Sequence, residues 1–453
     1  MKHYGNRVEE LKIAYIGGGS RGWAWTLMSD LARADDISGT VYLYDIDFEA
    51  ARRNEKIGNS IPNNFSYKAA ETLPEALKGA DFVVISILPG TFDEMESDVH
   101  WPEKYGIYQS VGDTTGPGGI LRAMRTVPMF ETIALAIRDN CPGAWVINYT
   151  NPMTVCVRSL YKVFPEIKAF GCCHEVFGTQ ALLGRLASDG GAPIPRHDIK
   201  VNVIGLNHFT WINSASWRGK DLFPLLYDFS RRLLSEPAKP IVRDGHFSYF
   251  GSQDRVKADL LLRFGVMGAA GDRHLAEFNK GGLYLRSPET AESWGFTLTP
   301  VSYRREDLKH RLELSEAYYS GKTPFSFKNS GEEGVLQMRA LLGLGDMITN
   351  VNLPNVGQIP NLPLGAVVET NASFTCDSLR PVAAGNIPAS ILPMIAGVSA
   401  NQELTVEAAL RRDKELAFCA FVSDQLMTAS LSDAERMFSE MFDNTAAYLK
   451  DYK

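Results

Sequence analysis

The sequence predicts an α/β protein, and three observations carry the prediction. The apolar run of residues 11–16 indicates a buried strand, which leads directly into Gly17-Gly18-Gly19-Ser20 and then into a helical pattern over residues 21–33. Apolar runs and helical patterns continue to alternate, as they do in a parallel sheet with crossover helices, and helical patterns then dominate the rest of the chain. We therefore expect a Rossmann-like, doubly wound N-terminal sheet in residues 1–195 and a mixed, helix-rich domain in residues 196–453.

Length, composition and charge limit the class of protein. A chain of 453 residues with 45% hydrophobic and 22% charged residues is ordinary for a globular enzyme. The net charge of −7, without a Lys/Arg run, argues against nucleic acid as a partner. No apolar stretch approaches the length of about eighteen residues that a membrane span needs, and no signal peptide is evident, so we expect no membrane contact. Six cysteines without disulfide-framework spacing fit a reducing cytoplasm.

A strand, a glycine turn and a helix in succession form a phosphate-binding unit. The glycines at 17–19 let the backbone approach a pyrophosphate, and the helix N-terminus offers free N–H groups, although Gly22 comes too early for the full dinucleotide fingerprint. Asp45 follows a predicted strand over residues 40–44, where an acid suits the ribose 2′-OH of NAD; Asp is also a favoured helix N-cap. The predicted NAD-binding residues are Gly17, Gly18, Gly19, Ser20, Arg21 and Asp45.

Two later strands, predicted over residues 144–147 and 167–170, end in polar segments. In an open α/β sheet such carboxyl ends form the edge at which ligands bind. Asn148 and Asn151 follow the first of these strands, where they either make turn hydrogen bonds or contact a substrate or cofactor. The second strand leads to Cys173-His174-Glu175, which offers a thiol, an imidazole and a carboxylate side by side.

Cys173 and His208 each follow an apolar strand, so both side chains could reach one site. A thiolate and an imidazole make half of a metal site, and ligand softness alone favours zinc; the alternative is that both are packed core residues. Asp272, Arg273 and Glu277 belong to a second polar cluster. There Asp272 could instead be a helix N-cap, and Arg273 and Glu277 could form a surface pair one helical turn apart.

Motifs at five points of the chain occur in a recognisable order and spacing. They are Ile16-Gly17-Gly18-Gly19-Ser20, Asp45, Asn148-Tyr149-Thr150-Asn151-Pro152, Cys173-His174-Glu175-Val176-Phe177-Gly178 and Gly205-Leu206-Asn207-His208. Together they resemble the NAD- and metal-dependent glycosidases of glycoside hydrolase family four, an exception to the paired-carboxylate glycosidases. The Cys-His pair is similar to the α-galactosidase and α-galacturonidase branches. The full cysteine motif, with Gly-Asp-Arg-His at 271–274, most resembles the α-galacturonidases.

The resemblance implies a mechanism and a set of roles. In this family NAD takes a hydride from C3 of the sugar, a divalent metal, usually Mn²⁺, polarises the resulting ketone, and a base removes the C2 proton before the glycosidic oxygen leaves C1. The family pattern implies that Cys173 and His208 bind the metal. The family is commonly dimeric or tetrameric, so we expect a homodimer or homotetramer.

The remaining roles also follow from the resemblance. His174 stands where other branches have an acid that protonates the leaving group, and an imidazole can fill that role. Asp272 is the candidate for the C2 base, although a tyrosine serves in other branches. Asn148 and Asn151 resemble residues that contact substrate hydroxyls, and Arg273 is the candidate partner for the carboxylate of a galacturonide.

Three classes of function compete. The first is an α-galacturonidase, with α-galactosidase as its neighbour, and it would release sugar without net NADH. The second is an NAD-dependent sugar or hydroxy-acid dehydrogenase, which would accumulate NADH and has no need for Cys173 with His208. The third is a non-catalytic dinucleotide-binding regulator, in which Cys173→Ser would change no activity. The cluster of motifs at the ligand edge of the sheet favours the first.

Overall fold

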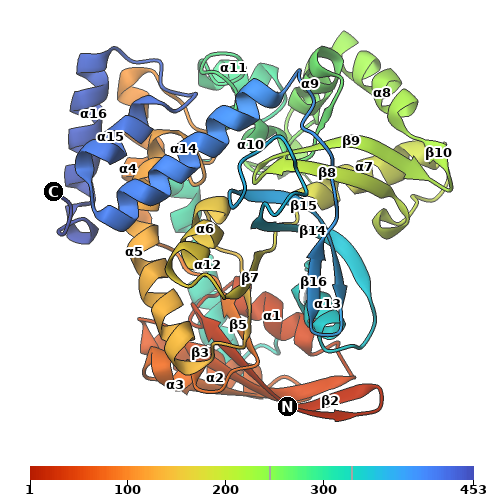
Figure 1. Ribbon diagram of the computed structural model, residues 1–453, viewed down its shortest axis with the longest axis vertical. Coiled ribbons are helices and arrows are strands. Elements are labelled where there is room, and N and C mark those ends of the chain that lie inside the picture. The colour runs from red at the N-terminus through yellow and green to blue at the C-terminus, as the bar shows by residue number, and fades with distance from the viewer. Residues whose placement is uncertain (244–245, 328–329) are drawn as a thin grey trace.

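The computed structural model describes residues 1–243, 246–327 and 330–453, and it confirms the α/β class. Its main sheet has ten strands (Figure 1). The strands of this sheet are β1 (Lys2–Tyr4), β2 (Arg7–Ile16), β3 (Ile37–Tyr44), β4 (Phe65–Ala70), β5 (Phe82–Ile85), β6 (Trp145–Asn148), β7 (Lys168–Gly171), β14 (Met347–Pro354), β15 (Val367–Thr375) and β16 (Ser378–Pro381). The neighbours β7-β6-β5-β2-β3-β4 pair in parallel, which is the strand order of a Rossmann fold.

Both faces of this parallel sheet are buried, because successive side chains of a strand point to opposite faces. In β2, Ile13 and Tyr15 pack into a cluster with α1 (Trp23–Leu31) and α2 (Phe48–Asn59). The residues between and after them, Ala14 and Ile16, pack into a second cluster with three other helices. Those helices are α3 (Leu73–Leu77), α5 (Gly116–Asn140) and α6 (Met153–Val163). The apolar run that predicted a buried strand is therefore explained by helices on both sides.

Strands from the second half of the chain complete the main sheet. The antiparallel strand β14 pairs with β7 at Asn352 and Gly171, and β15 and β16 extend the sheet from there. The sheet thus contains strands from both sides of residue 195, the boundary that composition suggested. Because β14 lies directly beside β7, the second half of the chain reaches the segment that follows β7.

Most of the remaining elements lie in the upper part of the molecule in Figure 1. A second sheet contains β8 (Lys200–Leu206), β9 (Phe209–Trp217), β10 (Lys220–Asp221) and β13 (Met267–Gly268), and a separate pair is β11 (Val242–Arg243) with β12 (His246–Phe247). The helices are α4 (Phe92–His100), α7 (Glu175–Ala187), α8 (Phe223–Ser235), α9 (Arg255–Phe264), α10 (Asp272–Glu277), α11 (Pro288–Ser293), α12 (Val301–Tyr319), α13 (Gly334–Leu341), α14 (Leu392–Arg411), α15 (Lys414–Val422) and α16 (Leu431–Asn444).

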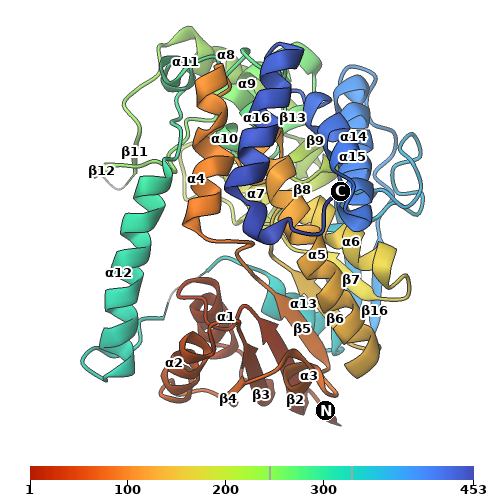
Figure 2. The same ribbon diagram turned by 90° about the vertical axis from the view of Figure 1, so that its left-hand side faces the viewer.

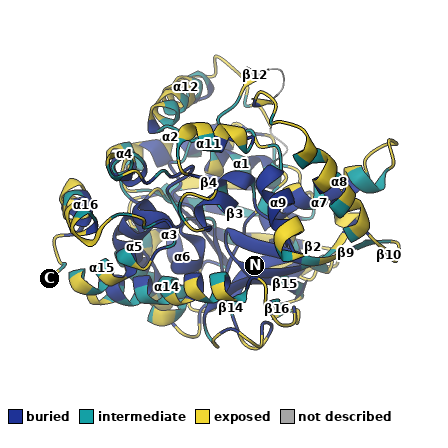
Figure 3. Cartoon of the chain, turned by 90° about the horizontal axis from the view of Figure 1, so that it is seen from above, coloured by how far each residue is buried: buried dark blue, intermediate teal, exposed yellow. Residues whose placement is uncertain are grey.

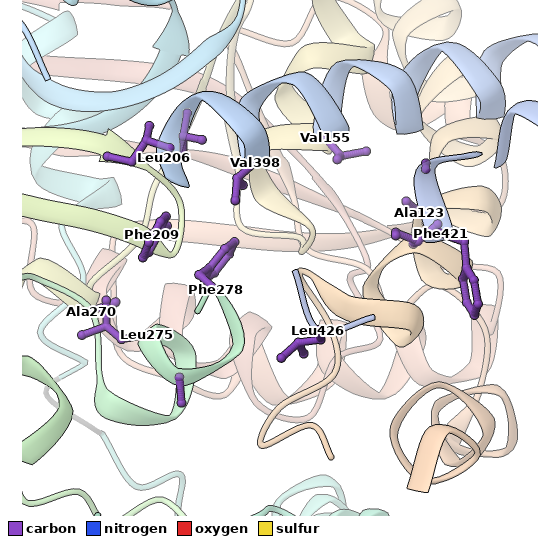
Figure 4. Close-up of a cluster of buried hydrophobic side chains, with 14 of the residues drawn as sticks. Ala123, Val155, Leu206, Phe209, Ala270, Leu275, Phe278, Val398, Phe421 and Leu426 are labelled. Carbon is purple, nitrogen blue, oxygen red and sulfur yellow. The ribbon is translucent and has the colours of Figure 1, made fainter. Parts of the chain in front are cut away.

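A large apolar cluster supports the turn between β8 and β9. Phe209, at the start of β9, stacks on Phe278 just after α10, with ring centroids 5.2 Å apart (Figure 4). Leu206 at the end of β8 and Val398 of α14 belong to the same cluster. The strands and the inward faces of the helices are buried, whereas the outward faces are exposed (Figure 3). The turn at residues 207–208 is therefore fixed on a rigid base.

Helix α12 connects the two parts of the molecule from outside. It runs along one side and packs against both α2 and α4 (Figure 2). Near its start Arg305 pairs with Asp93 at 2.6 Å, and near its end Glu316 pairs with Arg53 at 2.5 Å. Within the described part of the chain, no helix is both long and apolar enough to span a membrane.

Candidate functional site

Three segments that are distant in sequence bring Cys173, His208 and His274 to one site. Cys173 follows the carboxyl end of β7, and the Asn207 side chain in the turn between β8 and β9 hydrogen-bonds to its thiol. His208, the next residue of that turn, stacks on His274 of α10 with ring centroids 4.1 Å apart and planes inclined by 21°. The structure therefore brings the two predicted metal ligands into one neighbourhood.

The loop of residues 112–115 and the first turn of α5 form another wall of the site. Thr114 Oγ1 lies 3.2 Å from His208 Nδ1, so the two can share a hydrogen bond. The carboxylate of Asp424 accepts two hydrogen bonds of 3.0 Å from this segment, one from a backbone N–H and one from a hydroxyl. The loop is thus held at His208 by contacts from the C-terminal helices.

The donor set fits a metal ion that takes part of its coordination from elsewhere. Cys173 and His208 are 6% and 3% exposed. Burial lowers the pKa of His208 to about 3, helped by the neighbouring His274, so its imidazole is neutral and can donate a lone pair. Burial, together with the nearby carboxylate of Glu369, raises the pKa of the Cys173 thiol, which a bound cation would reverse. Within the described residues, no three His, Cys, Asp or Glu side chains form a complete metal cage.

Glu175, the first residue of α7, is a buried carboxylate among imidazoles. Its Oε1 lies 3.9 Å from His174 Nε2 and 3.8 Å from His274 Nε2, and its Oε2 accepts a hydrogen bond of 2.6 Å from the Gly271 N–H. Burial disfavours the ionised form, but the histidines outweigh it and lower the pKa of Glu175 to about 2. Glu175 therefore keeps a fixed negative charge beside the predicted metal ligands.

Asp113 places a second negative charge near the imidazoles. Its carboxylate accepts a hydrogen bond of 2.8 Å from Thr114 Oγ1. Burial disfavours ionisation here too, but Arg122, the two stacked histidines and Arg304 lower the pKa of Asp113 to about 2. The site thus alternates carboxylates with imidazole and guanidinium groups.

His174 stands at the N-terminus of α7, where it is the more accessible of the predicted catalytic residues. Its side chain is 53% exposed, and its Nδ1 lies 2.7 Å from Oε1 of Glu332, which is 7% exposed. This hydrogen bond raises the pKa of His174. The pair with Glu332 fixes the imidazole so that Nε2 is the nitrogen left for other partners.

Asp272 is fully buried and caps α9. Its Oδ2 accepts a hydrogen bond of 2.8 Å from the Arg255 N–H, and its Oδ1 accepts one of 3.1 Å from the Lys257 N–H. The expectation that Asp272 caps its own helix is wrong, because Gly271 is the N-cap of α10 and Asp272 instead accepts from the N-terminus of α9. Burial and the nearby Asp254 raise the pKa of Asp272 to about 6. Each oxygen keeps another lone pair, so the carboxylate can still accept a proton.

Arg273 and Glu277 are buried, so the alternative of a surface pair is wrong. One nitrogen of the Arg273 guanidinium donates to Ser110 O at 3.2 Å and to the Thr299 hydroxyl. Glu277 Oε1 instead accepts hydrogen bonds of 2.7 and 2.9 Å from the backbone N–H groups of residues 111 and 112. The two hydrogen bonds of Nη2 therefore fix the orientation of the Arg273 guanidinium group.

The two predicted substrate-binding asparagines have different surroundings. The Asn148 side chain donates to Thr150 O and accepts from Thr150 N, both at 3.0 Å, so it closes the turn after β6. The Asn151 backbone oxygen accepts a hydrogen bond of 3.1 Å from Arg122 Nε. Its buried Oδ1 has no hydrogen-bond partner in the described residues. Asn151 thus keeps a free acceptor, whereas Asn148 does not.

The glycine turn after β2 is a cradle that only small residues can form. Gly17 has a φ of +96°, and a Cβ there would collide with the carbonyl oxygen of Ser86 on β5's continuation. Ser20 Oγ accepts a hydrogen bond of 3.1 Å from the Trp23 N–H at the start of α1. The helix that was predicted to begin at Arg21 begins at Trp23 instead. Arg21 is half-buried and lies close to Asp45. The N–H groups of residues 17–20 donate to Tyr44 O, Asp45 and Gly17 O, so the glycines serve a pyrophosphate by letting it approach the backbone closely.

Asp45 belongs to this cradle and does not cap a helix. Its Oδ2 accepts a hydrogen bond of 2.8 Å from the Gly19 N–H, and its Oδ1 accepts one of 3.0 Å from the Asp47 N–H. Asp47 is the residue that caps α2. On the other side Asn54 donates to the carbonyls of Gly18 and Ser20 at 2.8 and 2.9 Å. The cradle is therefore rigid, with an acid at its rim.

Sequence reasoning assigned no role to several residues of the site, although Glu175 and His274 lie within motifs that it singled out. Those with a role in its charge pattern are Asp113, Arg122, Glu175, His274, Arg304 and Glu332. Asp113 lies in a glycine-dense loop before a long helix, a pattern that often marks a ligand loop. Arg304 and Glu332 follow no strand and carry no motif, so only the folded chain reveals them.

Models of one protein family match both halves of the chain. The model described as family 4 glycosyl hydrolase matches residues 12–188, and that of the family 4 glycosyl hydrolase C-terminal domain matches residues 203–427. The chain is 57% identical to an alpha-galacturonidase of Thermoanaerobacterium saccharolyticum, covering 100% of this chain and 99% of that one. It is 52% identical to an alpha-galacturonidase of Bacillus subtilis, covering 96% and 97%.

Solved structures share the fold. The crystal structure of a putative glucosidase from Bacillus subtilis, 52% identical, superposes with a TM-score of 0.91 over 96% of this chain and 100% of that one. A 6-phospho-alpha-glucosidase from gut microorganisms, solved in complex with NAD and Mn²⁺, is 18% identical and superposes with a TM-score of 0.80 over 98% and 100%. At 18% identity, the likeness to this second structure shows that the two proteins share a fold.

The surroundings of Glu277 predict a pH-dependent stability. Burial raises its pKa from 4.5 to about 8, so the folded state holds the proton more tightly than the unfolded state. The contribution of the Glu277 carboxyl to the free energy of unfolding is fully present below about pH 4.5. It is lost as the pH rises through about 8. Between about pH 5 and pH 9 we expect the native protein to lose about 3–5 kcal/mol more free energy of unfolding than Glu277→Gln.

Denaturant unfolding at several pH values measures this difference. Glu313→Gln, on the exposed face of α12, is the matched control and should follow the native protein. An identical pH profile for the native protein and Glu277→Gln would show that the Glu277 carboxyl is ionised in the folded state.

Proposed function

This chain belongs to family 4 of the glycosyl hydrolases, and we propose that it acts as an α-galacturonidase on α-D-galacturonides. The relatives named alpha-galacturonidase span the whole chain, which supports this substrate over a neutral galactoside. The observation that carries the proposal is the meeting of Cys173, His208 and the Glu332-bound His174 at one edge of the sheet. This combination suits a metal-dependent glycosidase and has no use in a plain dehydrogenase.

Two cofactors follow from the same proposal. NAD would bind to the cradle of residues 17–20 with Arg21 and Asp45, and Mn²⁺ would bind to Cys173 and His208. When bound, these groups supply hydride acceptance at C3 of the sugar and polarisation of the C3 oxygen. The glycine backbone of the cradle and the neutral imidazole of His208 support the fit. Family relatives from gut microorganisms, solved with NAD and Mn²⁺, support it as well.

Side chains of this protein would perform the proton transfers. His174, held through Nδ1 by Glu332, would protonate the departing glycosidic oxygen from Nε2. Asp272 would take the proton from C2; its raised pKa of about 6 suits a general base near neutral pH. Asn151, with its free Oδ1, would accept a hydrogen bond from a sugar hydroxyl. Arg273 would face the substrate carboxylate. Asn148, which was also predicted to bind substrate, would act by shaping the turn.

The assembly and location remain proposals from the family. A homodimer or homotetramer in the cytoplasm accords with the resemblance. The net charge of −7 argues against nucleic acid as a partner.

Release of p-nitrophenol tests the proposal. We expect the reduced protein to hydrolyse p-nitrophenyl α-D-galacturonide only when both NAD and Mn²⁺ are present. The matching α-D-galactoside should be a poor substrate, because it lacks the carboxylate. Hydrolysis of the galactoside alone would move the protein to the α-galactosidase branch. NADH that accumulates on free sugars, without hydrolysis, would favour the dehydrogenase.

The metal assignment predicts the effect of two substitutions. Cys173→Ser and His208→Ala should lower kcat/KM by at least about 100-fold, because loss of one of two protein ligands weakens the metal site. NAD binding, followed by fluorescence titration, should remain. Cys141→Ser is the control, since Cys141 is equally buried at 5% exposure in another cluster. Full activity of both ligand variants would contradict the metal assignment.

A further inference from the structure

Two guanidinium groups lie together at the edge of the site. Arg273 comes from the first turn of α10 and Arg304 from the first turn of α12. The guanidinium carbons lie 5.0 Å and 5.9 Å, respectively, from the centre of the same Phe250 ring. The ring therefore brings together two positive charges from elements that are distant in sequence.

Neither guanidinium forms an ion pair with a carboxylate of the described residues. In residues 1–243, 246–327 and 330–453, no carboxylate oxygen lies within 4.0 Å of a guanidinium nitrogen of Arg273 or Arg304. Glu277, one helical turn from Arg273, binds two backbone N–H groups instead, and burial raises its pKa so that it is uncharged near neutral pH. The ionised carboxylates that act on Arg273 are Glu175 and Asp113, and both are shared with the stacked histidines.

The two arginines differ in how much of the guanidinium is available. The Nη2 of Arg273 is committed to Ser110 O and to the Thr299 hydroxyl, which fixes its plane. Arg304 is half-buried. Its Nε has no hydrogen-bond partner in the described part of the chain, and neither has the Nε of Arg273. Buried donors of this kind cost free energy until an acceptor reaches them.

Like charges held close together in a partly buried place repel, so this arrangement favours a bound anion. We propose that Arg304 and Arg273 together bind the carboxylate at C6 of the sugar and that Arg304 determines the preference for galacturonides over galactosides. The inference rests on the proposed function, because it takes the neighbouring site to be the one that holds the sugar. Arg304 is thus a specificity residue that the sequence motifs do not contain.

A planar carboxylate suits the two guanidinium groups better than other anions do. Guanidinium groups bind carboxylates through pairs of parallel N–H···O bonds, and each of the two arginines has an Nε donor without a partner in the described residues. A phosphate ester at C6 is the other source of negative charge at this position, and it brings a bulkier tetrahedral group. We commit to the carboxylate and treat the phosphate as an outcome of the test.

Calorimetric titration of free sugars tests the inference without turnover. D-galacturonate, D-galactose and D-galactose 6-phosphate would be titrated into protein loaded with NAD and Mn²⁺. We expect Arg304→Gln to weaken galacturonate binding by about 10- to 100-fold and to leave galactose binding within about twofold. Arg304→Lys should recover only part of the loss, because an ammonium cannot form the bidentate contact. Arg305→Gln, the next residue of α12 with its side chain on Asp93, is the matched control.

The outcomes separate this inference from the proposed function. Equal losses for galacturonate and galactose, or no loss for either, would overturn the role of Arg304 even if the protein hydrolyses galacturonides. Tighter binding of galactose 6-phosphate that depends on Arg304 would overturn the carboxylate assignment. Galacturonate binding that depends on Arg304, in a protein that hydrolyses no galacturonide, would support this inference and contradict the proposed hydrolysis.

Discussion

The site depends on two buried carboxylates that stay ionised because positive or polarisable groups surround them. Burial alone would protonate Glu175 and Asp113, yet imidazoles and guanidinium groups keep the pKa of each near 2. The carboxylates and the groups around them come from α7, from the loop before α5, from α5, from the turn after β8, from α10 and from α12. Each ionised carboxylate is tolerated only while these groups are present, so the segments must adopt their positions together.

The main sheet makes that convergence possible. Parallel strands deliver the glycine cradle, Asn151 and Cys173 to one edge, as in other doubly wound sheets. Strand β14 then pairs with β7, and its Asn350 donates a hydrogen bond of 3.2 Å to Cys173 O. The C-terminal half therefore supports the cysteine through the sheet and presents His208 and His274 from above it. One edge of the main sheet can therefore hold residues for both a dinucleotide and a metal.

Local sequence patterns predicted the parts of the fold that depend on local physics. The buried strand before Gly17 and the acid at Asp45 follow from periodicity and turn chemistry, and the structure has both elements. The pairing of β14 with β7 was not predictable, since residues 347–354 are separated from β7 by most of the second half of the chain. For the same reason Glu332 and Arg304 were missed, although they meet His174 and Arg273 in the folded chain. Asp272 caps α9, a contact that only tertiary structure creates.

Hydrolysis in D₂O is the most direct test of the central claim, that this site removes the C2 proton of the sugar before the glycosidic bond breaks. The account predicts that the released galacturonate carries deuterium at C2, detected by proton NMR as loss of the C2 signal, because the proton taken by the base exchanges with solvent. Galacturonate released with a full C2 proton signal, at a rate that does not depend on NAD, would contradict the account and indicate direct displacement at C1.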